Sequence, residues 1–517
     1  MKVLLLGLGW FPDQSGGLNR YFRELFDRLR EHGVTSRAVV IGPAADAGID
    51  VAVACTAEDS LASRVRAFAT AAGRLGKTAE LVDVHFALYA FVPIVLGALR
   101  RKPLVVHFHG PWADESVSSG RCHPLTARAK QIVERAVYRR ATVAVTLSGA
   151  FKRVLVESYG VEPWKVKVVS PGVDLDRFSP GDRLAARDEL GLSSGSWVAC
   201  SVRRLVPRMG LDVLLRAWGM LDGERVLLIA GEGPERARLE QMAARFGFAD
   251  SVRFLGKVSE DELVSVYRSA DVCVVPSTSL EGFGLVVLEA LGCGIPVIAS
   301  DVGGLPSALA GLEPRCTVPV GDAPALAQRL LEPLPSARAC RATAERFSWD
   351  VCVRRHQDLY ANTVRSPRSR KLRALYVHPT ARLSRDGLAL LRILRTLEDA
   401  EPHVILGEEG PLVARLLEYG ISVEVFPPAP EVAALGRERV RAAMSVSSER
   451  LEARIYALRL SHRIRQLKPD RVHTDSLEGA LYGALAGRLA GIAAVADVHD
   501  QLADDCLPAA EEMQVRP

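Results

Sequence analysis

Short runs of apolar, β-branched residues alternate along the chain with segments whose apolar positions recur every three to four residues. The run at 2–9 (KVLLLGLG) is followed by a helix-period segment at 18–33 and then by a second run at 36–43. Such alternation predicts βαβ units, which form a parallel sheet with helices on both faces. The pattern continues through four further apolar runs, at 81–86, 102–110, 141–148 and 165–175.

A polar stretch at 174–195 interrupts the periodicity and is interpreted as the crossing between two domains, 1–174 and 175–364. A second series of apolar runs follows it and ends in a helix-period segment around 347–364. Each series is long enough for a sheet of five or six strands. Two doubly wound, Rossmann-like domains that face each other would form a cleft at the carboxyl ends of their strands, where ligands of such sheets bind.

The last part of the chain repeats the pattern of the first domain. A basic Pro/Ser segment, 365–371, is typical of a linker, and 372–517 repeats the pattern of the first domain. In both copies an Asp and a His close one strand, and a second strand ends on His109-Gly110 or His499-Asp500; the first pairs are Asp83 and His85, and Asp470 and His473. This predicts a third, incomplete Rossmann-like α/β domain.

Composition narrows the class of protein. The 517 residues are 48% hydrophobic and 25% charged, with a net charge of +5, which is typical of globular domains and does not favour a nucleic-acid partner. Nine cysteines without a C-x-x-C pair indicate neither a zinc site nor a disulfide framework, so a cytoplasmic location is expected. The apolar N-terminus is interpreted as a first strand, and the longest apolar stretch, 86–99, is too short to span a bilayer.

The stretch 281–304 (EGFGLVVLEALGCGIPVIASDVGG) places two carboxylates, Glu281 and Glu289, around a glycine turn that follows an apolar run. Gly284 and its neighbours allow the backbone to approach a ligand closely, and a helix is predicted over 285–291. The free N–H groups at the start of that helix would bind anions or hydroxyls. The alternative is a helix N-terminus with a favourable acid and an incidental surface glutamate.

Together with other motifs, this stretch makes residues 1–364 resemble the retaining glycosyltransferases of family 4, which have the GT-B fold. The resemblance covers about two thirds of the chain, and its pieces occur in the family's order: DQSGGLNRY, HFHGPW, SPGVDLDRF, VRRLVPRMG, IAGEGPERARLE, VRFLGKVSEDEL, the stretch 271–304 and a late FSWD. It implies transfer of a sugar from a nucleotide-diphosphate sugar to a hydroxyl acceptor such as a glycolipid, a polysaccharide or a small-molecule glycoside.

The resemblance also implies roles for individual residues. Glu281 would contact the donor sugar, and Glu289 would hold the ribose of the nucleotide. Arg204 would clamp the diphosphate and neutralise the leaving group. The family has a Lys where this chain has Met209, so Arg208 is a candidate substitute, the alternative being that Arg208, like Arg203, is a solvated surface charge.

Further donor-site residues follow from the same resemblance. Gly16 and Gly17, in the loop before the first helix, would bring backbone close to the donor phosphates. The rest of the nucleotide site would come from Gly231 and from the turn after Glu281, which comprises Phe283, Gly284 and Leu285. His109 would face the donor sugar, or it is a satisfied structural residue like His85 and His107. A dinucleotide fingerprint starting at Gly7 fails on spacing, because Pro12 stands where a third glycine belongs.

No metal and no other cofactor is expected, because no carboxylate pair of the D-x-D kind follows a strand near the site. Two basic amphipathic segments, 60–77 and 126–141, are either helices that pack on the sheet or a peripheral contact with the inner face of a membrane. The alternative function is a catalytically impaired nucleotide-sugar-binding or scaffolding protein, which Met209 favours. The segment 372–517 lacks the acidic pair and should not transfer sugar unaided.

Overall fold

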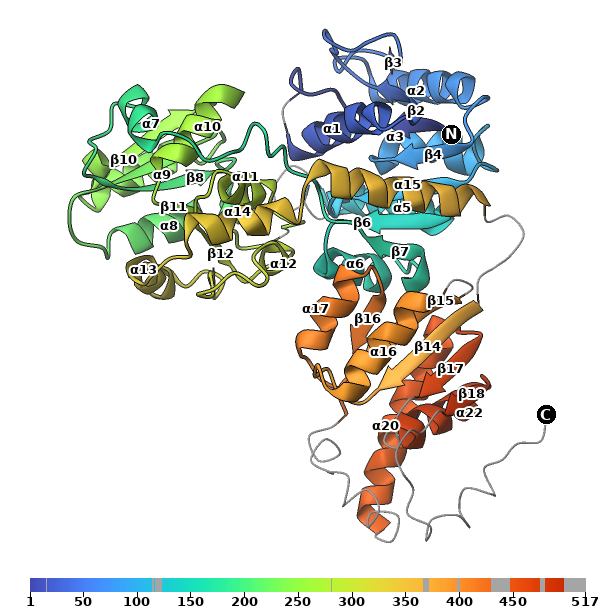
Figure 1. Ribbon diagram of the computed structural model, residues 1–517. Coiled ribbons are helices and arrows are strands. Elements are labelled where there is room, and N and C mark those ends of the chain that lie inside the picture. The colour runs from blue at the N-terminus through green and yellow to red at the C-terminus, as the bar shows by residue number, and fades with distance from the viewer. Residues whose placement is uncertain are drawn as a thin grey trace. The chain divides into compact units, whose positions relative to one another are not determined.

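The computed structural model describes residues 1–14, 16–113, 116, 123–279, 281–365, 372–397, 400–428, 447–474 and 479–496 (Figure 1). The chain forms two compact units, the first of residues 1–161 and 168–366 and the second of residues 162–167 and 367–517. Three sheets are present in the described chain, and the strand pairs within them are parallel. The α/β class predicted from the alternating pattern is therefore confirmed.

The N-terminal domain of the first unit is built on a seven-stranded sheet, where five or six strands were expected. The strands lie in the order β3-β2-β1-β4-β5-β6-β7 and comprise β1 (Lys2–Leu6), β2 (Thr35–Val40), β3 (Val51–Val53), β4 (Leu81–Val84), β5 (Leu104–Phe108), β6 (Val143–Thr146) and β7 (Val166–Val168). The helices are α1 (Gly17–Glu31), α2 (Leu61–Leu75), α3 (Ala87–Phe91), the π-helical η1 (Val92–Leu96), α5 (Pro124–Arg140) and α6 (Gly149–Glu157). The 3₁₀ turn η2 (Pro163–Lys165) follows in sequence and lies in the segment 162–167 that is assigned to the second unit. The extra strand is the short run β3, which pairs with β2 at the edge of the sheet.

Helix α15 (Trp349–Arg365) completes the core of this domain although it follows the second domain in sequence. Figure 1 shows it beside α1, and the two helices are in contact. Trp349, Cys352, Val353 and Tyr360 of α15 are buried in one cluster with the apolar face of α1 and with strands β1, β2 and β5. Burial of these side chains ties the end of the second domain to the first.

The C-terminal domain of the first unit has a six-stranded sheet in the order β10-β9-β8-β11-β12-β13. Its strands are β8 (Trp197–Val202), β9 (Arg225–Ala230), β10 (Val252–Gly256), β11 (Val272–Val275), β12 (Val297–Ser300) and β13 (Thr317–Val318). Its helical segments are α7 (Arg183–Glu189), η3 (Pro207–Met209), α8 (Leu211–Trp218), α9 (Arg236–Arg245), η4 (Ala249–Ser251), α10 (Glu260–Ser269), α11 (Leu285–Gly292), α12 (Leu305–Ala308), α13 (Ala323–Leu331) and α14 (Ala337–Glu345).

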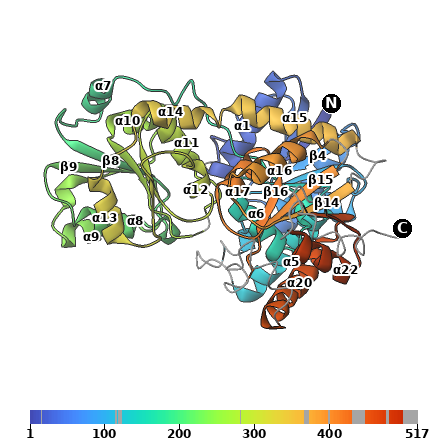
Figure 2. The same ribbon diagram turned by 60° about the horizontal axis from the view of Figure 1, so that its bottom comes forward.

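The helices of this domain cover both faces of its sheet, as a doubly wound fold requires. Figure 2 shows α10, α11 and α14 on one side of the strands and α8, α9 and α13 on the other. Each layer buries its own apolar cluster against the strands. The polar stretch predicted as an irregular crossing contains helix α7, whose N-cap Asp182 accepts hydrogen bonds from two backbone N–H groups of its first turn.

The second unit has a five-stranded sheet in the order β16-β15-β14-β17-β18, the order that β3-β2-β1-β4-β5 have in the first domain. Its elements are β14 (Leu372–His378), α16 (Arg385–Thr396), β15 (Ala400–Leu406), α17 (Pro411–Glu418), β16 (Ser422–Val425), α20 (Ser447–Leu467), β17 (Arg471–Thr474), η5 (Ala480–Ala484), α22 (Leu485–Ala490) and β18 (Ala494–Ala496). The predicted linker from residue 366 on and the pair His499-Asp500 lie outside the described residues.

One predicted equivalence between the two copies is wrong in register. Asp83 is the third residue of β4, whereas Asp470 precedes β17 and accepts a hydrogen bond from the backbone N–H of Arg373, 2.9 Å away. The third residue of β17 is His473. The two aspartates therefore occupy different places, one near the carboxyl end of its strand and the other before the amino end.

Candidate active site

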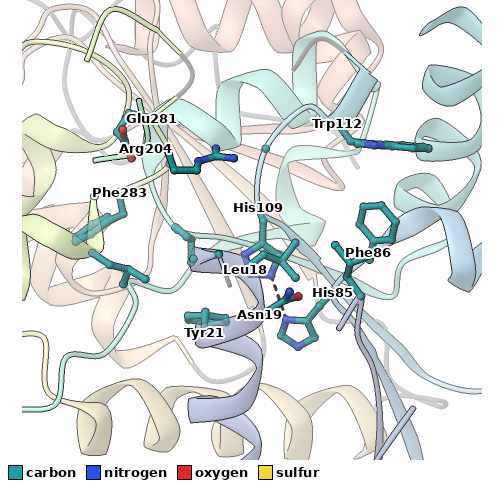
Figure 3. A pocket seen from close by; sticks show the side chains of 18 of the residues that line it. Leu18, Asn19, Tyr21, His85, Phe86, His109, Trp112, Arg204, Glu281 and Phe283 are labelled. Carbon is teal, nitrogen blue, oxygen red and sulfur yellow. Dashed lines mark hydrogen bonds between the residues drawn. The ribbon is translucent and has the colours of Figure 1, made fainter. Parts of the chain in front are cut away.

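A pocket of about 510 Å³ lies between the two domains of the first unit (Figure 3). The N-terminal domain contributes residues after β1, β4 and β5 and from the start of α1, and the C-terminal domain contributes residues after β8 and at the start of α11. All of these segments follow the carboxyl ends of parallel strands, where such sheets bind ligands. The volume is in the range typical of small-molecule sites.

Two helix N-termini open onto this pocket. Gly16 and Gly17 line it at the start of α1, and Gly284 and Leu285 line it at the start of α11. Gly284 has φ 81°, and a Cβ atom there would lie 2.6 Å from Leu305, so only glycine fits this turn. The unsatisfied N–H groups and the positive dipole ends of both helices favour a negatively charged ligand.

Glu281 lines the pocket beside the second helix start, and Arg203 fixes its carboxylate. The Arg203 guanidinium donates to both Glu281 and Ser277, and the Ser277 hydroxyl donates to Glu281 at 3.0 Å. Burial opposes ionisation of Glu281, but the neighbouring Arg203 holds its pKa below the ordinary value. The interpretation of Arg203 as a solvated surface charge is wrong, because its side chain is only 5% exposed.

The other two arginines of the same loop, Arg204 and Arg208, line the pocket together with Met209. The Arg208 carbonyl accepts hydrogen bonds from Thr278, with the backbone nitrogen 2.9 Å away, and Gly210 packs so closely on Pro276 that a Cβ would lie 1.9 Å from its carbonyl oxygen. These contacts hold the loop against the segment that follows β11. The structure thus brings two cationic side chains to the carboxylate and the helix N-termini.

Two predicted site residues, Glu289 and Gly231, do not line this pocket. Glu289 is buried, accepts a hydrogen bond from the Tyr267 hydroxyl at 2.8 Å and pairs with Arg20 at 3.3 Å. A Cβ on Gly231 would lie 1.9 Å from the carbonyl oxygen of Arg203, so this glycine serves close packing of two backbone segments. Phe283, by contrast, lies on the pocket wall as predicted.

Four histidines and an aspartate form a cluster in the N-terminal domain and helix α15, and all of them except the partly exposed His109 are buried. His109 lines the pocket, and its Nε2 lies 3.1 Å from Nδ1 of His85, which lines the pocket as well (Figure 3). Asp83 lies beneath them, with its carboxylate 3.4 Å from His85 Nε2 and 3.1 Å from His107 Nε2. His356 of α15 stacks on His107, with ring centroids 5.3 Å apart.

Sequence reasoning treated His85 and His107 as structural and missed the hydrogen bond between His85 and His109. A signal for it was available, because D-x-H (Asp83, His85) and H-x-H (His107, His109) end neighbouring parallel strands. A spacing of two puts side chains on one face of a strand. His107 fits the structural interpretation, since its side chain is 1% exposed and it does not line the pocket.

These histidines also contain the ligand atoms of a candidate metal site, since nitrogens of His85, His107 and His109 lie within 4.8 Å of one another. His85 Nδ1 and His109 Nε2, however, lie 3.1 Å apart and form a hydrogen bond with each other. One of these two nitrogens must carry the proton of that bond, so in this arrangement they do not both present a lone pair to an ion.

The pocket wall formed by the N-terminal domain includes Phe86, Trp112 and Tyr138, and Glu134 holds the turn that carries Trp112. Its carboxylate accepts hydrogen bonds from the backbone N–H groups of Trp112 and Ala113, at 3.0 and 3.3 Å, and from the hydroxyls of Tyr138 and Tyr159. Trp112 faces the pocket beside Phe86, with ring centroids 5.4 Å apart. A flat aromatic face on a polar pocket is a surface on which a sugar ring can stack.

Two Rossmann-like domains face each other across a pocket that is lined by arginines and by the N-termini of α1 and α11. This is the architecture of the GT-B class of glycosyltransferases. The model "Glycosyltransferase Family 4" matches residues 15–177, and "Glycosyl transferases group 1" matches residues 182–346. A protein of Catenulispora acidiphila named D-inositol 3-phosphate glycosyltransferase 2 is 32% identical over 401 residues, 70% of this chain and 93% of that protein. The chain therefore belongs to the family 4 glycosyltransferases and is an enzyme that transfers a sugar from a nucleotide-sugar donor to an acceptor.

Solved structures agree on the fold. A sucrose-phosphate synthase from Thermosynechococcus elongatus superposes with a TM-score of 0.59 at 24% identity, over 70% of this chain and 98% of the other. Anabaena HepE in complex with UDP and glucose superposes with a TM-score of 0.58 at 20% identity, over 70% of this chain and 100% of the other. The 70% of this chain that superposes is close to the fraction made up by residues 1–364, the part in which the sequence resembles the family.

Proposed function

We propose that the pocket binds the donor as a nucleoside diphosphate-sugar, with its diphosphate between the N-termini of α1 and α11 and its sugar between Glu281 and His109. The observation that carries this proposal is the convergence of Arg204, Arg208 and the two helix starts on one pocket. Cations and oriented N–H groups stabilise the charge that develops on a leaving diphosphate. The anomeric configuration is retained in this proposal, as in the family that the sequence resembles.

Arg208 takes the place of the family's lysine in this proposal. Its guanidinium lies on the pocket wall beside Met209 and helps to lower the pKa of Glu281, so its charge acts at the site. With two arginines on the diphosphate, the transfer requires no divalent cation. Full activity in the presence of EDTA is expected, and a loss that Mg²⁺ or Mn²⁺ restores would contradict this part of the proposal.

The acceptor is a neutral hydroxyl compound with a face that stacks on an aromatic ring. The described pocket residues of the N-terminal domain include aromatic, aliphatic and glutamate side chains but no Lys or Arg. Lys130 lies 4.5 Å above the Trp112 ring and donates to Ser116, so its ammonium is already engaged. Relatives are named for D-inositol 3-phosphate, and the decisive comparison is therefore free inositol and simple glycosides against inositol phosphate as acceptors.

Peripheral membrane contact is proposed through helix α2. Leu61 and Val65 of α2 line an open, mostly apolar groove together with Val92 and Arg66. Leu61 is 52% exposed, and among the described residues no helix is long and apolar enough to cross a membrane. Cosedimentation with vesicles of anionic lipid tests this contact, and Leu61→Ser should release the protein.

The donor proposal is tested by thermal unfolding with UDP, GDP and ADP in turn. A nucleotide at a hundred times its Kd stabilises the native state by about 2.7 kcal/mol, which a shift in melting temperature would show. The shift should disappear in Arg204→Met and persist in Arg66→Met, a surface arginine that lies outside the pocket. If no nucleotide shifts the wild type, or if one binds while no sugar is transferred, the impaired-scaffold alternative is favoured instead.

A further inference from the structure

The histidine cluster rests on a carboxylate that is entirely buried. Asp83 has no exposed surface, and the Tyr360 hydroxyl donates a hydrogen bond to it from helix α15. Burial alone would raise its pKa, but His107 and His85 beside it hold the pKa well below the ordinary value. Asp83 is therefore a carboxylate, which accepts hydrogen bonds and donates none.

The Asp83 carboxylate determines where the proton of His85 lies. His85 Nε2 is buried 3.4 Å from an oxygen of Asp83 and makes no well-aligned hydrogen bond, so the carboxylate acts on it by its charge. A negative oxygen at this distance favours the tautomer of His85 that carries its proton on Nε2. In that tautomer the other ring nitrogen, Nδ1, has a lone pair and accepts. The residue 3.1 Å from this lone pair is His109, through its Nε2. His109 must then carry its own proton on Nε2 in order to donate to His85.

His109 itself is neutral in this environment. Burial lowers its pKa well below the ordinary value. A neutral imidazole has one N–H and one lone pair, and its N–H is used on His85. The remaining nitrogen, Nδ1 of His109, is left as a hydrogen-bond acceptor on a residue that lines the donor pocket.

We propose that Asp83 and His85 are positioning residues, which fix the tautomer of His109 so that its Nδ1 accepts a hydrogen bond from a hydroxyl of the donor sugar. This inference rests on the proposed function of the pocket. It assigns a direction to the contact, because His109 accepts and the sugar hydroxyl donates. It also explains why an aspartate is buried beneath the site, since a neutral residue there would leave the direction of the His85–His109 hydrogen bond undetermined.

The proposal predicts how transfer depends on the donor. A donor whose hydroxyl opposite His109 is replaced by hydrogen leaves the Nδ1 lone pair unsatisfied in a desolvated pocket. The expected loss in kcat/KM is about 10- to 100-fold, as for an unpaired buried acceptor. In Asp83→Asn the carboxamide can donate to His85 Nε2, which inverts the hydrogen bond between His85 and His109 and presents an N–H of His109 to the sugar. Asp83→Asn should therefore transfer sugar more slowly, and it should discriminate little between donors with and without the hydroxyl opposite His109.

The tautomer is measured directly by long-range ¹H–¹⁵N NMR of the full chain labelled with ¹⁵N-histidine, without any need for activity. His109 is assigned from the spectrum of His109→Gln. The proposal expects a protonated Nε2 and an unprotonated Nδ1 on both His85 and His109. It is overturned if His109 carries its proton on Nδ1, or if both nitrogens of His85 are protonated, since His85 would then donate to His109.

Two variants separate positioning from simple loss of stability. Tyr360→Phe also removes a hydrogen bond from Asp83 but leaves the chain of tautomers intact, so melting temperature should fall while the His109 spectrum and the donor-hydroxyl preference persist. If Asp83→Asn does not fold, His85→Phe replaces it, since it removes the nitrogen that accepts from His109 and so leaves the tautomer of His109 undetermined. Nucleotide-induced melting shifts report on the donor site separately, so failure of the tautomer prediction and failure of the donor proposal are distinguishable.

Discussion

Replacing Arg203 should destabilise the protein strongly, because the charge of Arg203 keeps the buried Glu281 ionised. The Arg203 and Glu281 side chains are 5% and 13% exposed, so their pairing takes place almost out of water. Removing one member of a buried ion pair costs about 3 to 5 kcal/mol, because the other charge stays buried and uncompensated. In a domain of this size each kcal/mol lowers the melting temperature by about 2 to 4 °C, so Arg203→Met should lower it by about 6 to 20 °C.

The pH dependence of this loss has a definite sign. In the wild type the pKa of Glu281 is below the ordinary value of 4.5, so the stability that the pair contributes is present above that pH and is lost as the pH falls through the lowered pKa. Without Arg203, burial dominates and raises the pKa of Glu281. The variant is then most stable below the ordinary value and loses stability as the pH rises. The difference in melting temperature between the wild type and Arg203→Met should therefore be smaller at pH 5 than at pH 7.5.

Differential scanning calorimetry of both proteins at the two pH values measures this difference. Arg204→Met is the matched control: it removes the adjacent, exposed arginine, and its melting temperature should stay within about 2 °C, as for a surface charge. Glu281→Gln combined with Arg203→Met should recover part of the loss, since no buried carboxylate remains. A loss below about 1 kcal/mol, or one of equal size at pH 7.5 and pH 5, would refute the reasoning.

Three further predictions concern other parts of the first unit. Glu134→Gln should weaken acceptor binding and raise the KM for the acceptor at least about tenfold, because the two backbone N–H groups of the Trp112 turn use different carboxylate oxygens and an amide nitrogen cannot replace either of them as an acceptor; an unchanged KM would contradict this. Arg20→Met should lower the melting temperature by a few degrees, since Arg20 joins α1 to Glu260 and Glu289 of the other domain, and high salt should reduce the difference. The Cys352 thiol, whose pKa burial raises to about 12, should react with a thiol reagent at pH 8 only after unfolding.

The sheets and the donor-side loop were predictable because local patterns determine them. Alternating apolar runs identify parallel strands, and a glycine turn followed by an apolar helix places Glu281 in the loop between β11 and α11. The direction of Arg203 was not predictable, since β8 ends at Val202 and the next two arginines face different ways. Only the packed fold shows that Arg203 turns into the domain while Arg204 reaches the pocket.

Contacts between distant segments account for the other differences. Glu289 meets Arg20 although 269 positions separate them, and no periodicity within either helix indicates that pair. Asp83 meets Tyr360 across 277 positions, through a helix that returns from the second domain to the first. Such contacts depend on how two domains close on each other, which is a property of the whole core and not of a local stretch.

The second unit repeats the strand order of the N-terminal domain but not the residues of its histidine cluster. Its five strands follow the order of the first five strands of the N-terminal domain, yet the place of Asp83 in β4 is taken in β17 by His473, which stacks on Tyr376 with ring centroids 4.9 Å apart. A histidine there cannot supply the permanent acceptor that orders the chain of imidazoles beneath the donor pocket. The framework of strands is repeated, but the carboxylate on which that chain depends is not, and nothing in the described part of the unit replaces the Glu281 loop. The described parts of the two copies therefore share a strand order without sharing these side chains, because each strand order tolerates many side chains at its carboxyl ends.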